Sequence, residues 1–454
     1  MDQADPSAIL ARIEVAQLLE RSQLSAFHYR LIILSCLITF FDGLDLMMIS
    51  YTAPYLRGPL GLDASMLGRV FAAATVGQII GGLVFPYLAD MIGRRPVILG
   101  TAFLFGVLTL ATSLAHDYHS LLILRFTNGI AIGGMLPIAW ALNIEAVPRR
   151  MRATVVTVIM LGYSFGSAFA GPMTNMLAPT HGWQAVFIAG GIATLMAASL
   201  LALFLPESVR HMVSRNRDPA RIAKALAAIQ PGFKVQPGMS FHLGDEDAKQ
   251  RHFNPRDLFA GDLAAITPVL WLAYFASALA IFFTSSWGPT LLEALDTPRK
   301  LAALISAFSG MLGALSGVLL LRFTEKRGPR WIMLYPALAV PVLFALGFGF
   351  VPRDWFYIFV ILGGLLIGGS HAAVISIAGI YYPSAIRANG AGWATSFAKV
   401  GGVLAPLIGA VLIGGHTPPI HAYAALSICP AIIVIAIFSL SRIVESKQVR
   451  TPHV

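Results

Sequence analysis

Long apolar runs separated by short polar connections repeat along almost the whole chain. Twelve runs are long enough for a helix to cross a bilayer, because about 30 Å of hydrocarbon takes roughly 20 helical residues. Lipid offers the backbone no hydrogen-bond partner, so each run is predicted to be helical. Their approximate limits are 29–54, 65–87, 96–115, 119–143, 152–178, 183–205, 266–292, 300–322, 330–350, 355–380, 388–414 and 420–442.

One long polar connection divides these runs into six and six. Its segment RNRDPARIAKALAAI is expected to form a short helix within a linker between two halves. The expected parts are a cytoplasmic N-terminal segment at 1–28, a six-helix bundle at 29–205, a cytoplasmic linker at 206–262, a second six-helix bundle at 263–442 and a cytoplasmic tail at 443–454.

The N-terminal segment mixes charges of both signs and carries no signal-peptide pattern. Ile9, Ile13, Leu18 and Leu19 are spaced to form one apolar face. We expect a short amphipathic helix here, lying at the inner membrane surface.

The two halves also repeat in sequence. A shift of 235 positions superposes several residues without a gap. The matched sets are Gly129, Ile132, Gly133, Gly134, Pro148, Arg152 and Ala153 against Gly364, Ile367, Gly368, Gly369, Pro383, Arg387 and Ala388. Two parallel repeats with a binding site near their interface are the plan of a secondary transporter. The predicted fold class is therefore an all-α polytopic membrane protein with two pseudo-symmetric six-helix bundles.

The composition agrees with this class, since 57% of residues are hydrophobic and only 12% are charged. A formal net charge of +10 would by itself fit nucleic-acid binding, but the placement of the basic residues indicates membrane orientation. With both termini taken as cytoplasmic, 25 Lys and Arg residues fall on the inner side and 5 on the outer side. This asymmetry follows the positive-inside rule and predicts cytoplasmic termini.

Two carboxylates lie near the middle of the first span, Asp42 and Asp45 in ITFFDGLDLMM. A charge at a helix centre costs about 2.5 to 3.5 kcal/mol on insertion scales. Their spacing of three places both on one helix face, and a structural pair bonded to neighbouring helices remains an alternative. The repeat shift carries them to Ser277 and Ala280. Because the second half has no equivalents, we favour a chemical role in proton coupling.

Two cations lie well inside spans, Arg125 and Lys399. Arg125 and Asp45 differ in depth by about 5 Å at 1.5 Å per residue, within reach of a guanidinium side chain. They are expected to pair, with a purely structural salt bridge as the alternative. Lys399 lies too deep for its ammonium to reach either interface. We expect it to bind a substrate carboxylate or to pair with an aspartate.

A substrate that carries an aromatic ring would need ring contacts, and aromatic residues within the spans could supply them. The candidates are Tyr274, Phe283 and Trp287 in span 7 and Trp393 in span 11. Ordinary core or lipid packing remains the alternative for each. His371 in span 10 is a further candidate for the substrate site, in a titrating role, with a hydrogen-bonded core histidine as the alternative.

Charged clusters mark the inner ends of the spans. They are expected to form an inner gate that is closed when the transport cavity faces outward, with orientation alone as the alternative. Their members are Asp90, Arg94, Arg95, Glu145, Arg149 and Arg152 in the first half and Glu325, Arg330 and Arg387 in the second.

Several of these segments resemble one family. ADMIGRRPVIL is similar to the inner-loop signature of the major facilitator superfamily, with Pro86 where that signature usually begins with glycine. LRFTNGIAIGG, NIEAVPRRMRAT and LPES resemble its sugar and organic-acid branches. FFDGLD and YYPSAIRANGAGWA resemble the aromatic acid:proton symporters. The resemblance implies a proton-sensitive pair of Asp45 and Arg125, and an arginine is usual where this chain has Lys399.

The hypothesis is therefore a proton-coupled symporter that imports small aromatic carboxylates of the hydroxybenzoate type across a bacterial inner membrane by alternating access. Its expected partners are the carboxylate, protons and the lipid bilayer, with no nucleic acid and no cofactor, and the chain is expected to be a monomer. A symporter for non-aromatic organic acids or sugars and a non-transporting membrane sensor are the alternatives. An enzyme is disfavoured because no metal-ligand cluster, phosphate loop or nucleophile motif occurs in the sequence.

Overall fold

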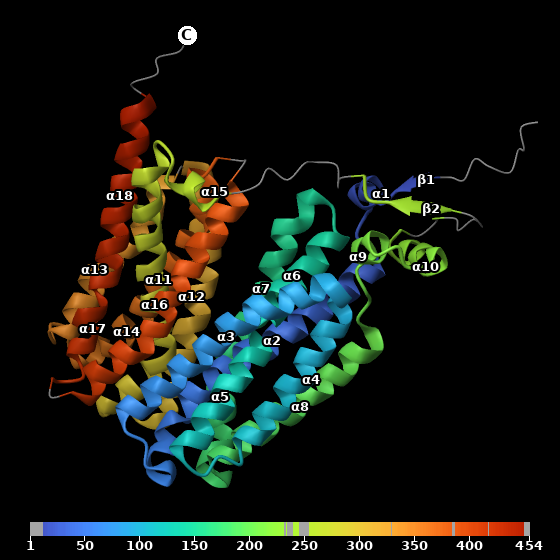
Figure 1. The fold of residues 1–454 in the computed structure, drawn as a ribbon. Helices are drawn as coiled ribbons and strands as arrows, with labels where there is room; N and C mark the ends of the chain where they lie inside the picture. Colours follow the sequence, from blue (N-terminus) through green and yellow to red (C-terminus); the bar gives the residue numbers. More distant parts are fainter. Residues whose placement is uncertain are drawn as a thin grey trace, which may run out of the picture.

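The computed structural model describes residues 12–230, 233, 239–244, 254–327, 329–383, 386–415 and 417–448. Within this part of the chain, twelve helical segments are long and apolar enough, by length and composition, to cross a membrane. The prediction of twelve spans in two bundles is therefore confirmed, and Figure 1 shows the two bundles side by side.

The first bundle contains the helices that follow the N-terminal segment. They are α2 (Ala26–Leu60), α3 (Ala64–Ile92), α4 (Arg94–Thr112), α5 (Tyr118–Gly133), α6 (Met135–Ala146), α7 (Arg149–His181) and α8 (Trp183–Phe204). Short polar turns join them, and Asp63 and Asp117 cap α3 and α5 by accepting hydrogen bonds from backbone N–H groups of the first turn.

The second bundle follows the linker. Its elements are α11 (Leu263–Ala294), α12 (Arg299–Arg327), η3 (Pro329–Met333), α13 (Leu334–Gly347), η4 (Arg353–Trp355), α14 (Phe356–Ser376), α15 (Ala378–Tyr381), α16 (Arg387–Gly414), α17 (His421–Leu426) and α18 (Ile428–Gln448).

The fourth span differs from its prediction because it is broken into α5 and α6 at Gly134. A Cβ built on Gly134 would lie 2.3 Å from the Cβ of Phe85, so α3 approaches the break closely. A second break, at Ile377, separates α14 from α15 in the tenth predicted span. Apolar periodicity does not register such interruptions, since the side chains on both sides remain apolar.

The N-terminal segment also differs from its prediction. Ile13 lies in a strand, β1 (Arg12–Glu14), which pairs in parallel with β2 (Ser240–His242) of the linker. The helix α1 (Val15–Arg21) follows it, with Val15 and Leu19 buried against protein. The expected single amphipathic helix is therefore wrong at Ile13, because the linker supplies a strand partner. Ile9 lies outside the described residues.

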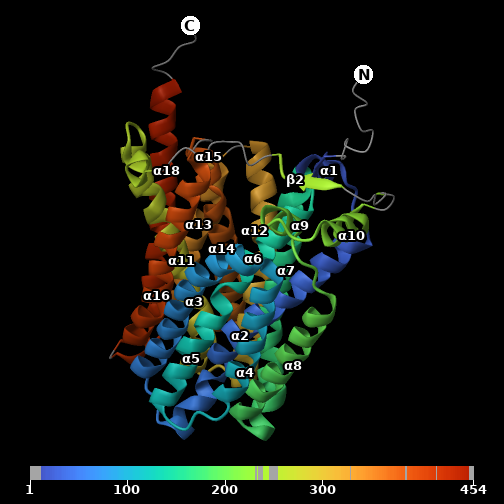
Figure 2. The same ribbon diagram turned by 45° about the vertical axis from the view of Figure 1, so that its right-hand side comes forward.

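The linker adds two short helices, α9 (Val209–Ser214) and α10 (Pro219–Ile229), and the turn η2 (Pro255–Phe259). The helix expected from RNRDPARIAKALAAI is confirmed as α10. Figures 1 and 2 place α1, α9 and α10 together at one end of the first bundle. The last turns of α18 lie at the same end of the second bundle. We call this the terminal end.

Glycine allows the helices within each bundle to touch backbone to backbone. A Cβ built on Gly129 of α5 would lie 2.2 Å from the carbonyl oxygen of Ala74 of α3. Its repeat counterpart, Gly364 of α14, would place a Cβ 2.7 Å from the Cβ of Ser309 of α12. The sequence repeat thus corresponds to the same helix contact in each bundle, and close packing of this kind drives helix association in lipid.

The two bundles meet at the end opposite the termini, which we call the closed end. There Phe71 of α3 lies edge-on to Trp287 of α11, with ring centroids 5.4 Å apart. Asn175 Nδ2 of α7 donates to the Lys300 carbonyl of α12 at 2.9 Å. Figure 1 shows the bundle ribbons converging at this end and diverging toward the terminal end.

Replacing Gly129 should test the helix contact. Gly129→Ala is expected to lower stability by about 1 to 3 kcal/mol, because the added methyl overpacks the α3–α5 contact. Gly100→Ala on α4 is the matched control, since a Cβ there meets nothing within 4 Å. Thermal unfolding of the purified protein in detergent, followed by tryptophan fluorescence, measures both. Equal midpoints for the two variants would contradict this packing.

Candidate functional site

An ion pair lies inside the first bundle, between Asp45 of α2 and Arg125 of α5. Arg125 Nη2 donates to Asp45 Oδ2 at 2.8 Å and to Oδ1 at 3.1 Å. Arg125 is 1% exposed and Asp45 5% exposed, so the pair is screened from water on all sides. The contact predicted from similar depth is present in the structure, while its role in proton coupling stays a prediction.

Two further residues complete the surroundings of the Asp45 carboxylate. Asn128 Nδ2 donates to Oδ1 at 3.2 Å and to Oδ2 at 3.1 Å, and Thr109 Oγ1 donates to Oδ1 at 3.2 Å. Both are fully buried. The sequence reasoning missed them, although Asn128 follows Arg125 by three residues and therefore shares its helix face.

The guanidinium of Arg125 is held by a ring as well as by the carboxylate. Its Cζ lies 5.6 Å from the ring centroid of Phe187 of α8, which fits a cation–π contact. Nε and Nη1 are buried and have no hydrogen-bond partner among the described residues. The pair therefore uses one nitrogen, Nη2, rather than the two-nitrogen fork that arginine often presents.

Asp42 is also buried, at 3% exposed, but its surroundings differ. No residue in the described part of the chain donates a hydrogen bond to its carboxylate. It lies on the side of α2 that packs on α7, within electrostatic reach of Tyr163. The neighbouring Gly43 makes this packing close, since a Cβ there would lie 2.1 Å from the Tyr163 carbonyl oxygen. Gly43 is therefore the point where α7 approaches α2 closely.

The second bundle has neutral residues at the positions equivalent to Asp42 and Asp45. Ser277 of α11, the repeat equivalent of Asp42, is hydrogen-bonded to His371 Nδ1 of α14 at 3.2 Å. Ala280, the equivalent of Asp45, is buried among apolar residues. The predicted candidate His371 thus lies beside the position where the first bundle carries an acid, and its expected substrate contact is not tested by this geometry.

Lys399 of α16 reaches the first bundle. A Cβ built on Gly82 of α3 would lie 3.2 Å from Lys399 Nζ and 3.2 Å from the carbonyl oxygen of Gly133. The side chain is half-buried, and in the described part of the chain it forms no hydrogen bond or ion pair. Its side-chain nitrogen therefore lies between the two bundles.

The aromatic candidates lie in two different settings. Tyr274, Phe283 and Trp287 are buried in α11. Tyr274 donates its hydroxyl hydrogen to the Ile375 carbonyl, and Trp287 Nε1 donates to the Pro406 carbonyl at 3.0 Å. Trp393 of α16 is 43% exposed and stacks on Trp271, with centroids 6.1 Å apart. Trp393 is thus the candidate with the most accessible ring.

The charged cluster at the terminal end centres on Arg94. Its Nη2 contacts Asp90 Oδ1 and Glu145 Oε1, both at 2.8 Å, and its Nη1 donates to His211 Nδ1 at 3.1 Å. Burial lowers the pKa of His211, which keeps the imidazole neutral and able to accept. Ser208 Oγ donates to the second oxygen of Glu145. The cluster lies within the first bundle and the start of the linker.

Glu207 anchors the loop that carries Arg94 and Arg95. Its carboxylate accepts hydrogen bonds from the Arg94 N–H at 3.0 Å and from the Arg95 N–H at 3.3 Å, at the start of α4. Gly93 has φ of +120°, and a Cβ there would lie 2.4 Å from Glu207 Oε2. The motif LPES was noted in the sequence, but its glutamate and serine were not assigned to this cluster.

The remaining gate candidates are dispersed. The Arg149 N–H donates to both oxygens of Glu20 of α1, and Arg152 lines an opening beside it. Arg387 Nε donates to the Tyr382 carbonyl at 3.3 Å, and Arg330 is exposed in η3. The side chain of Glu325 lies outside the described residues.

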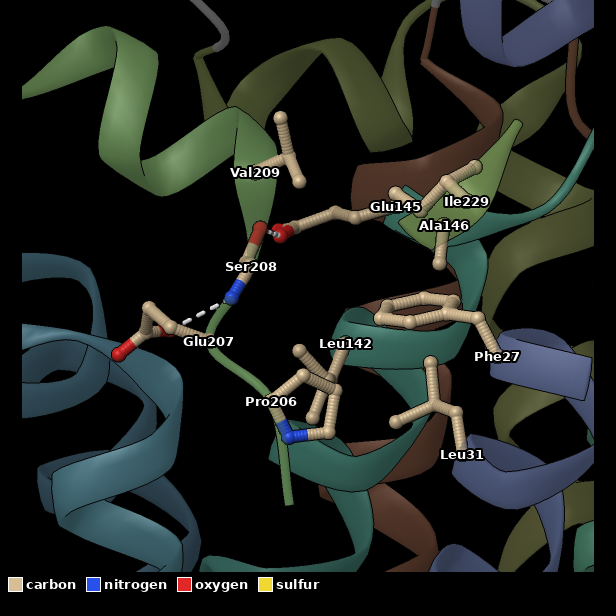
Figure 3. A pocket seen from close by; sticks show the side chains of 10 residues that line it. All are labelled: Phe27, Leu31, Leu142, Glu145, Ala146, Pro206, Glu207, Ser208, Val209 and Ile229. Carbon is tan, nitrogen blue, oxygen red and sulfur yellow. Dashed lines mark hydrogen bonds between the residues drawn. The ribbon is translucent and has the colours of Figure 1, made fainter. Parts of the chain in front are cut away.

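A small pocket at the terminal end lies beside this cluster (Figure 3). Figure 3 shows Phe27 and Leu31 on one side and Ser208 and Glu207 on the other, with the Glu145 side chain reaching from the side of Ala146 to Ser208. None of the residues predicted for substrate binding lines it. Among the described residues, no group of three or more His, Cys, Asp or Glu side chains is placed to hold a metal ion.

Comparisons with known proteins agree on the class. Residues 35–406 match the family model described as Major Facilitator Superfamily. The 4-hydroxybenzoate transporter PcaK of Pseudomonas aeruginosa is 33% identical over 404 residues, which cover 89% of this chain and 90% of that protein. The gallate transporter of Pseudomonas putida is 31% identical over 89% of both chains.

A solved structure shares the fold. The xylose transporter XylE from E. coli, in a partially occluded inward open conformation, superposes with a TM-score of 0.70 at 18% identity. The match covers 92% of this chain and 98% of that chain. At this identity the likeness concerns the fold alone.

Removing one partner of the buried pair should destabilise the protein more than removing both charges. Arg125→Gln and Asp45→Asn are each expected to cost about 3 to 5 kcal/mol, because each leaves an uncompensated buried charge. The double variant Asp45→Asn/Arg125→Gln should recover most of that loss. Thermal unfolding in detergent measures all four proteins. A double variant that loses the sum of the single losses would contradict a direct pairing.

Proposed function

The chain belongs to the Major Facilitator Superfamily, and on that premise we propose that it is a proton-coupled symporter that imports small aromatic carboxylates of the hydroxybenzoate type. Transport proceeds by alternating access, in which two rocking bundles expose a central site to each side of the membrane in turn.

The substrate class rests on the curated relatives. Proteins named as transporters of 4-hydroxybenzoate and of gallate match about nine tenths of this chain at 31% identity or more. Both compounds are aromatic rings that carry a carboxylate. A cation between the bundles suits such an anion, and Lys399 is a cation in that position.

The coupling ion is inferred from the acids of α2. Uptake of an anion into a negatively charged cell runs against the membrane potential, and each compensating proton supplies about 2.3 kcal/mol per 100 mV. Asp42 and Asp45 are buried carboxylates in a bilayer interior, where such groups commonly belong to proton relays. Together with Arg125 they form the proposed proton-coupling site.

The protein is a multi-pass membrane protein. We assign it to the inner membrane of a bacterial cell with both termini in the cytoplasm, on the basis of the 25 inner and 5 outer basic residues. The terminal end is then cytoplasmic, and bundles that meet at the closed end correspond to an inward-facing state. The functional unit is proposed to be one chain, because each chain contains both bundles.

The cluster around Arg94 is proposed to serve the inner gate. In the structure Arg94 contacts Asp90 and Glu145 within the first bundle. When the bundles close at the terminal end, this charged surface meets the end of the second bundle that carries Arg330 and Arg387. In the closed state the cluster would contact the second bundle, and in the open state it would contact only its own bundle. The same charged groups would therefore stabilise one state or the other, but not both at once.

Uptake into proteoliposomes tests the proposed function directly. With an inward proton gradient imposed, the purified protein should accumulate labelled 4-hydroxybenzoate above the external concentration, and an uncoupler should abolish the accumulation. Unlabelled benzoates should compete, whereas hexoses and short aliphatic acids should not. Competition by a sugar or an aliphatic acid alone would favour another substrate class, and binding without uptake would favour a sensor.

Lys399→Ala is expected to weaken binding of the carboxylate, because it removes the cation between the bundles. Lys399→Arg should retain much of the affinity, since it supplies the same charge. Titration calorimetry of 4-hydroxybenzoate into purified protein measures the affinity. Lys224→Ala, at an exposed position on α10, is the matched control. Equal affinities for Lys399→Ala and the control would remove Lys399 from the binding site.

A further inference from the structure

We propose that the two aspartates of α2 have different tasks, with Asp42 taking up and releasing the transported proton and Asp45 remaining ionised as the fixed counter-ion of Arg125. Asn128 and Thr109 are positioning residues that hold Asp45 in its ionised state. This division deepens the proposed function, because it rests on coupling to protons and states which carboxylate performs it.

The hydrogen bonds around Asp45 favour its ionised form. Three side chains from two other helices donate to it, namely Arg125 and Asn128 of α5 and Thr109 of α4. Both carboxylate oxygens accept at least two of these contacts. A carboxylate surrounded by donors is stabilised as an anion, and a proton on either oxygen would displace one of them.

The charge balance of the pair supports the same assignment. Asp45 and Arg125 together carry no net charge, and each is within hydrogen-bond distance of the other. Protonation of Asp45 would leave the Arg125 guanidinium buried without a counter-ion. Leaving a buried charge unpaired is strongly destabilising. A proton cycled through Asp45 would therefore meet this penalty in every turnover.

Asp42 has none of these constraints. No donor among the described residues contacts its carboxylate. The groups that face it are Asp45 on its own helix, which is the charged residue acting on it, and the uncharged hydroxyl of Tyr163 on α7. When a carboxylate without donors accepts a proton, it loses no hydrogen bond. Protonation also removes its repulsion with the neighbouring anion and its charge from the apolar interior of the bundle.

Infrared difference spectroscopy of the purified protein can identify which aspartate binds the proton, without a transport assay. A pH titration should reveal one buried carboxylic acid by its C=O stretch in the wild-type protein. The band should be lost in Asp42→Asn and kept in the double variant Asp45→Asn/Arg125→Gln, whose charges remain balanced. Thermal unfolding confirms that each variant is folded before its spectrum is taken.

Transport by the same variants supplies a second readout. Asp42→Asn should lose accumulation driven by a proton gradient yet still exchange internal for external labelled 4-hydroxybenzoate, because exchange needs no net proton movement. The double variant should keep some gradient-driven accumulation. A titrating band that is kept in Asp42→Asn and lost in the double variant would overturn the assignment and give the proton to Asp45.

The transport and infrared measurements test the proposed function and the assignment of the proton separately. If the wild-type protein accumulates no aromatic acid under a proton gradient, the proposed function fails, while the infrared titration still reports which aspartate binds a proton. The positioning role of Asn128 has its own signature. Asn128→Leu, which is close in size but donates nothing, should add a second titrating carboxyl band; an unchanged spectrum would remove Asn128 from that role.

Discussion

The absence of water inside a bilayer is the constraint on which this structure depends. Every buried polar group needs a partner supplied by the protein, and the first bundle meets this need for Asp45 and Arg125 with side chains from α2, α4, α5 and α8. The same constraint makes Asp42 and Lys399 informative, because neither has a hydrogen-bond partner in the described part of the chain. Groups left without partners in such a setting are where a ligand or a proton is expected to act.

The two bundles use this constraint differently despite a common origin in sequence. Gly129 and Gly364 occupy equivalent contacts, so the repeat preserves the scaffold. At the position of Asp42, however, the second bundle has Ser277 bonded to His371. The acids lie on one bundle and the unpaired ammonium of Lys399 on the other. Opposite charges on separate bodies allow a bound ion to alter how those bodies attract each other, and this is how a binding event can be linked to a rocking motion.

Much of this architecture follows from sequence because helical geometry is regular. Counting 1.5 Å per residue places Asp45 and Arg125 at similar depth, and the fixed shift between halves locates the matching glycines. The parts that escaped prediction depend on contacts between distant segments. Threonine is common in such helices, where its hydroxyl usually bonds the backbone of its own helix. The bond from Thr109 to Asp45 therefore has no signal in the sequence. The pairing of Ile13 with Phe241 and the capping of α4 by Glu207 likewise join segments far apart in the chain.

Small residues form part of the contact at the closed end, beside the Phe71–Trp287 ring pair, and this affects how fast the bundles can separate. A Cβ on Gly68 would lie 2.6 Å from the Cβ of Ala410, and one on Gly171 would lie 3.3 Å from that of Ala307. Where these small residues meet, the helices can part without long side chains having to withdraw from one another, so little repacking opposes the motion there. Conformational steps often limit turnover in proteins that alternate between states. Contacts between small residues at the closed end therefore favour rapid cycling. Bulky substitutions there would slow turnover before they lowered the affinity for substrate.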